Sequence, residues 1–119
     1  MSNPKLQLIL PMLLPLDTAR DRSLLIAKWT DLVRHVLPGL AAQHGWPISA
    51  DHCFMRVCLD TALGAPWHTI VRRPAIRHLS DAQLSAAIAV ADSLVRAPET
   101  LWPLNRQSIE WRKTSRGGQ

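Results

Sequence analysis

Several residue types are scarce or missing in this chain of 119 residues. It has no Tyr, one Phe, three Lys and two Cys, against five Trp and eleven Arg. Small secreted domains usually hold more cysteines, evenly paired. Cys53 and Cys58 are five residues apart, and about 7.5 Å of helical rise is at or beyond the Cα separation that a disulfide tolerates. We therefore expect two reduced thiols and a cytoplasmic protein.

No apolar run is long enough to cross a bilayer. The longest such stretch, residues 6–16, is interrupted by Pro11 and Pro15, which bar a regular helix and a central strand. A single Lys precedes it and no small-x-small cleavage site follows, unlike a signal peptide. We expect an extended arm over residues 1–16. Its apolar part, 6–16, would dock on this domain, on a second copy in a homodimer, or on a partner protein.

Alternating apolar and polar residues are also missing, as are hairpin dipeptides such as Asn-Gly. Helical spacing of apolar residues is frequent instead, so the sequence predicts an all-α fold, an irregular bundle of four to five helices. The length suits one domain. We expect a single helical domain over residues 17–113 and a flexible tail over 114–119.

Local signals place the ends of the main helices. The first begins near Asp17 or Thr18 and is ended or kinked by Pro38-Gly39. The second covers 50–63, the third 81–96 and the last 106–113. The expected start signals are Ser49 for the second helix, the capping box Ser80-x-x-Gln83 for the third and Asn105 for the last. Gly64 is expected to end the second helix and Pro98 the third.

Three ionisable residues form a stripe on the second helix, whose other positions are mostly apolar. His52, Arg56 and Asp60 recur at every fourth residue and therefore share one face. One interpretation is a solvated face with ordinary ion pairs. The other is a cleft in which His52 is an acid–base residue, Asp60 its partner and Arg56 an anion clamp.

Acidic residues are missing from the 20 residues between Asp60 and Asp81, although the chain has nine in total. The same stretch holds three arginines and two histidines. Its candidate ligand-binding residues are Arg72, Arg73, Arg77 and His78. Guanidinium groups suit phosphate and carboxylate oxygens, so this stretch predicts an anion site. An ordinary solvated loop is the alternative. If the loop folds over helix 50–63, the two features form one site.

Common reaction and cofactor motifs are missing as well. The His and Cys spacings do not fit zinc modules, and there is no glycine-rich phosphate loop. We expect neither a metal nor a cofactor.

The net charge of +5 and the arginine-rich loop favour a small basic protein that binds nucleic acid or another polyanion. Two alternatives stay open. One is an enzyme or ligand-binding protein with an anionic substrate in a His52/Arg56/Asp60 cleft. The other is an accessory subunit that docks through residues 6–16.

Overall fold

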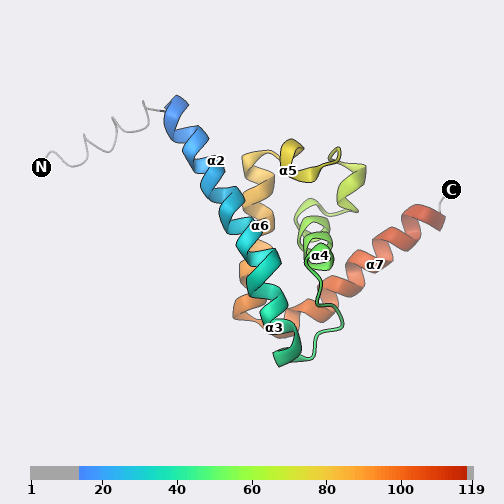
Figure 1. Cartoon of the computed structure of the whole chain (residues 1–119). Coiled ribbons are helices and arrows are strands. Elements are labelled where there is room, and N and C mark those ends of the chain that lie inside the picture. Colours follow the sequence, from blue (N-terminus) through green and yellow to red (C-terminus); the bar gives the residue numbers. More distant parts are fainter. Residues whose placement is uncertain (1–13, 118–119) are drawn as a thin grey trace, which may run out of the picture.

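The computed structural model describes residues 14–117, which form helices joined by short connections (Figure 1). No strand occurs in this range. The elements in chain order are α2 (Leu14–Asp31), the π-helix η2 (Leu32–Val36), α3 (Leu37–His44), α4 (Asp51–Leu63), the 3-10 helix η3 (Trp67–Thr69), α5 (Ala75–His78), α6 (Asp81–Arg96), the 3-10 helix η4 (Pro98–Thr100) and α7 (Leu101–Gly117). The elements α2, η2 and α3 follow one another without a gap and form one long helix. Together with α4, α5, α6 and α7 this gives five helices in the described range, so the predicted all-α class with four to five helices is confirmed.

The first helix begins at Leu14, earlier than expected from the capping signals near Asp17. Residues 14–16, predicted to be extended, therefore belong to α2. Pro15 fits there because the first helical turn has backbone N–H groups without an intrahelical partner, so a missing N–H costs nothing. The rest of the predicted arm, 1–13, lies outside the described residues, and its docking role stays a prediction.

Pro38 does not end the first helix. It has no backbone N–H, and in a regular helix its ring would clash with the carbonyl of Arg34. The preceding turn is widened into η2, where the N–H of Leu37 bonds to the carbonyl of Leu32. Such π turns are a known way to absorb a disruption of the α-helical ladder. The helix then continues to Gly45, which closes it with φ 65°.

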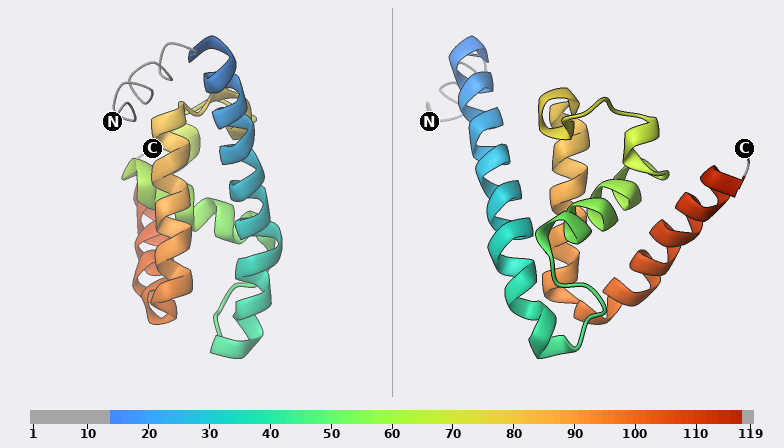
Figure 2. Two further views of the ribbon diagram at one scale, coloured as in Figure 1. Left: turned by 90° about the vertical axis from the view of Figure 1, so that its left-hand side faces the viewer. Right: turned by 45° about the vertical axis from the view of Figure 1, so that its right-hand side comes forward.

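Helix α4 is the central helix, as its apolar composition predicts. Its side chains Phe54, Val57, Cys58 and Leu59 are fully buried. It begins after Ala50, which has extended backbone angles and no side-chain cap, so the predicted cap Ser49 is one residue early. Gly64 ends it with φ 75°, in the left-handed region that favours glycine. The helix lies between α6 and α7 and contacts both (Figure 2).

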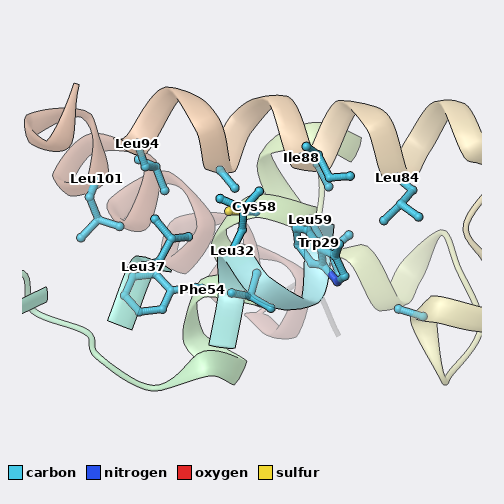
Figure 3. Close-up of a cluster of buried hydrophobic side chains, with 14 of the residues drawn as sticks. Trp29, Leu32, Leu37, Phe54, Cys58, Leu59, Leu84, Ile88, Leu94 and Leu101 are labelled. Carbon is cyan, nitrogen blue, oxygen red and sulfur yellow. The ribbon is translucent and has the colours of Figure 1, made fainter. Parts of the chain in front are cut away.

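Helix α6 has the predicted bounds. The Ser80 hydroxyl accepts from the N–H of Gln83, and the Gln83 side chain accepts from the N–H of Ser80, which completes the capping box. Ala87 and Ala91 are fully buried, and their small size lets neighbouring helices approach. The core combines side chains from α2, η2, α3, α4, α6 and α7 (Figure 3): Trp29, Leu32, Leu37, Phe54, Cys58, Leu59, Leu84, Ile88, Leu94 and Leu101.

Helix α7 is longer than predicted at both ends. It begins at Leu101 rather than Arg106 and continues to Gly117, into the segment expected to be a flexible tail. Pro103 is compatible with this start because it lies in the first turn, where its missing N–H has no partner to lose. Asn105 is therefore not a helix cap. It lies inside α7, and its side chain is buried against α4.

Candidate functional site

The three residues of the polar stripe on α4 stand in different surroundings. The side chain of His52 is 80% exposed, and its Nδ1 lies 3.7 Å from Oδ1 of Asp51. The side chain of Asp60 is 0% exposed. Eight residues of helix separate them by about 12 Å of rise, so they are beyond hydrogen-bond reach of each other. The structure thus does not bring His52 and Asp60 together as an acid–base pair.

Asp60 is held by four hydrogen bonds from three neighbours. Its Oδ1 accepts from the backbone N–H of Trp67 at 2.8 Å and from Nη2 of Arg112 at 3.1 Å. Its Oδ2 accepts from the hydroxyl of Ser108 at 2.7 Å and from Nε of Arg112 at 2.8 Å. A buried carboxylate needs such partners to compensate for lost hydration. Both oxygens are engaged, so this carboxylate joins α4 to α7 and η3.

Arg56 extends the same network one turn away. Its Nη1 donates to Oγ of Ser108 and its Nη2 to Oδ1 of Asn105, both at 2.8 Å. Ser108 therefore accepts from Arg56 while it donates to Asp60. Arg56 is bound to neutral oxygens of α7 and is half-buried. Its guanidinium is thus engaged within the fold.

The α7 residues that bond to Arg56 and Asp60 can be recognised in the sequence only when the start of α7 is placed correctly. Asn105, Ser108 and Arg112 recur at helical spacing, so they share one face once α7 is extended back to Leu101. With Asn105 assigned as a cap, this face is interrupted and the pattern is lost. The assignment of Asn105 as a helix cap therefore separated three residues that all contact α4.

The predicted loop over residues 72–78 is a loop only in part, because Ala75–His78 form the short helix α5 and place Arg77 and His78 in its last turn. The four predicted anion-binding residues are all at the surface. Arg72, Arg73, Arg77 and His78 have exposed side chains. Ion pairs among the described residues do involve other cations: Arg22, Lys28, Arg34, Arg112 and Lys113 each lie within 4.0 Å of a carboxylate. None of these ion pairs includes Arg72, Arg73 or Arg77. The loop between α4 and α6 therefore carries positive charge that the described part of the chain does not neutralise.

One of these arginines packs on an aromatic ring. The guanidinium carbon of Arg73 lies 5.1 Å from the ring centroid of Trp67. Trp67 is half-buried and packs against the hydrophobic core. The backbone N–H of Trp67 is bonded to Asp60, which anchors the backbone of η3 at the C-terminal end of α4.

The two predicted features meet only at this end of α4. Trp67 links Asp60 to Arg73, but Arg56 faces α7 and is not among the exposed cations. A separate hollow of about 270 Å³ lies between the first helix, α4 and α5. Its lining is mainly apolar: Ile26, Trp29, Thr30, Val33, Arg34, Met55 and Ile76. It includes none of the candidate site residues.

The thiols are free within the structure. Cys53 is half-buried and Cys58 fully buried. Burial raises the pKa of the Cys58 thiol from 9.0 to about 12, because an anion is poorly solvated in the apolar core. Within residues 14–117, no group of three or more His, Cys, Asp or Glu side chains is placed to hold a metal ion.

Comparisons with protein-family models, with curated proteins and with solved structures find no match for this chain. Over the range that the structure covers, no helix is both long enough and apolar enough to span a membrane.

Proposed function

We propose that this protein binds phosphate-bearing polyanions, nucleic acid above all, through the exposed loop around Pro74. The binding groups are Arg72, Arg73 and Arg77, with His78 beside them. The observation that carries the proposal is the clustering of three exposed arginines without carboxylate partners among the described residues, in a stretch of 20 residues without acid.

The charges suit this role because of how they are spaced and held. A guanidinium offers several N–H donors in a plane, which matches two oxygens of a phosphate. Three such groups occur within six residues, at positions 72, 73 and 77, so a bound polyanion can meet several of them. Each phosphate that is neutralised releases bound counterions, so affinity depends steeply on salt. Arg56 makes no contribution here, because it is bound to Ser108 and Asn105.

The test is a salt titration of binding with a fluorescent DNA duplex and with inorganic polyphosphate. Polarisation anisotropy gives the dissociation constant at each salt concentration for the wild type and for the triple variant Arg72→Gln, Arg73→Gln, Arg77→Gln. Glutamine keeps most of the side-chain length and removes the charge. For the duplex, loss of three phosphate contacts lowers the slope of log Kd against log salt concentration by about 2 to 3.

A matched control removes the same net charge elsewhere. Arg20, Arg96 and Arg106 are exposed and lie on α2, α6 and α7. Their triple replacement by Gln has the same total charge as the loop variant. The proposal expects the control to keep the wild-type slope to within about one unit. No binding by the wild type at low salt, or equal losses in both variants, would refute a site at this loop.

A further inference from the structure

We propose that the loop prefers single-stranded nucleic acid, and that an unpaired base stacks on the ring of Trp67. This inference rests on the polyanion binding proposed above and specifies its ligand. Trp67 begins η3, its N–H is held by Asp60 at 2.8 Å, and its ring packs against the core. Two groups lie near the ring: the guanidinium of Arg73 is 5.1 Å over it, and the ring of His68 stands edge-on with its centroid 6.0 Å away.

Further groups follow Trp67 closely in the chain. Ile70 comes directly after η3 and caps its C-terminal end. The N–H of Ile70 bonds to the carbonyl of Trp67 at 3.0 Å, and the side chain of Ile70 is 50% exposed. Arg73 follows three residues later. An aromatic face, an exposed aliphatic side chain and a cation thus follow one another along the loop.

A base can replace the guanidinium on this ring at a net gain. An exposed cation–π contact is worth roughly two- to fivefold in an equilibrium constant. Stacking of a base on an aromatic side chain is worth roughly 5- to 140-fold. The displaced guanidinium of Arg73 is then free to bind a phosphate of the same strand. Bases of a duplex are already stacked on their neighbours, so only an unpaired base is available to Trp67.

The experiment separates base stacking from phosphate binding. Wild-type protein is titrated with a ten-nucleotide oligo-dT and with an abasic strand of the same length and charge, and an oligo-U strand tests RNA. The same titrations are made with Trp67→Leu, with Trp67→Phe, and with the control Trp102→Leu. Trp102 is exposed near the start of α7. Circular dichroism verifies that each variant is folded.

The expected result is a wild-type preference for oligo-dT over the abasic strand of roughly fivefold to thirtyfold. Trp67→Leu should remove this preference, Trp67→Phe should keep part of it, and Trp102→Leu should keep all of it. Equal wild-type affinity for both strands, or an unchanged preference in folded Trp67→Leu, would overturn the inference. If Trp67→Leu does not fold, base stacking is tested by the wild-type preference for oligo-dT over the abasic strand and by its reduction in Trp67→Phe.

Failure of this inference differs from failure of the proposed function. If the protein binds polyphosphate and both strands equally, the polyanion site stands and the base site does not. If it binds none of these at low salt, the polyanion site itself is refuted. Comparable preferences for oligo-dT and oligo-U over the abasic strand would show that the base, rather than the sugar, is recognised.

Discussion

Replacement of Arg112 by Met is the sharpest test of the buried network. Met has a long apolar side chain, so the substitution removes the guanidinium while keeping much of the packing. Asp60 then loses two of its four hydrogen bonds and its counter-charge, but keeps the donors from Ser108 and Trp67. Removal of one partner from a buried ion pair costs about 3–5 kcal/mol. Because the Arg112 side chain is 25% exposed, water can enter, and we expect about 3 kcal/mol.

The assay is urea unfolding followed by tryptophan fluorescence and by circular dichroism, which also tests two-state behaviour. Arg106→Met is the control, because Arg106 is exposed on the same helix and its replacement should change the free energy of unfolding by less than about 0.5 kcal/mol.

The double variant Asp60→Asn, Arg112→Met completes a cycle. We expect it to cost less than the sum of the two single variants, since a neutral amide in place of the carboxylate leaves no buried charge without a partner. A loss below about 1 kcal/mol for Arg112→Met, or strict additivity in the cycle, would show that Asp60 does not depend on Arg112.

Two further predictions concern the thiols and the glycines. Because burial raises the pKa of Cys58 to about 12, its thiol stays protonated in the fold while the unfolded thiol ionises above pH 9. Stability should therefore fall by about 1.4 kcal/mol per pH unit above pH 9, and Cys58→Ala should lack this loss in urea titrations at pH 8 and 10. Iodoacetamide should label Cys53 first; equal labelling of Cys58 in native protein would contradict its burial. Gly39 is helical, and a Cβ added to it would meet nothing within 4 Å, so Gly39→Ala should raise the free energy of unfolding by about 0.5–1 kcal/mol. Gly64 has φ +75°, which strains any residue with a Cβ, so Gly64→Ala should lower the free energy of unfolding by about 1–2 kcal/mol. Thermal melts that rank the two glycine variants in the opposite order would refute this reasoning.

Helix α6 shows how much local signals can specify. Both of its ends follow from the sequence, because the Ser80–Gln83 capping box acts within four residues and Pro98 prevents continuation. The ends at Gly45 and Gly64 follow from the same short-range physics, since only glycine adopts a left-handed conformation at little cost.

Helix boundaries near prolines could not be predicted from short-range signals. The sequence predicts that Pro15 bars a regular helix and that Pro38 ends or kinks one. Pro15 instead lies in a first helical turn, and Pro38 is accommodated by the π turn before it. Whether a proline interrupts a helix or begins one depends on how the neighbouring residues pack. A sequence window around the proline does not contain that information.

Composition and short-range pattern alone established the helical class, the central place of α4, and a stretch of 20 residues with arginine but no acid. Caps, turns and apolar periodicity act over a few residues, so they can be recognised without a structure. Only the tertiary structure decided which charges are used within the fold. Asp60 and Arg112 are 52 residues apart in the sequence, and they bind each other because α4 and α7 pack together. The same packing binds Arg56 to α7 and leaves the loop arginines exposed, because ion pairs form between whichever surfaces the folded chain brings together.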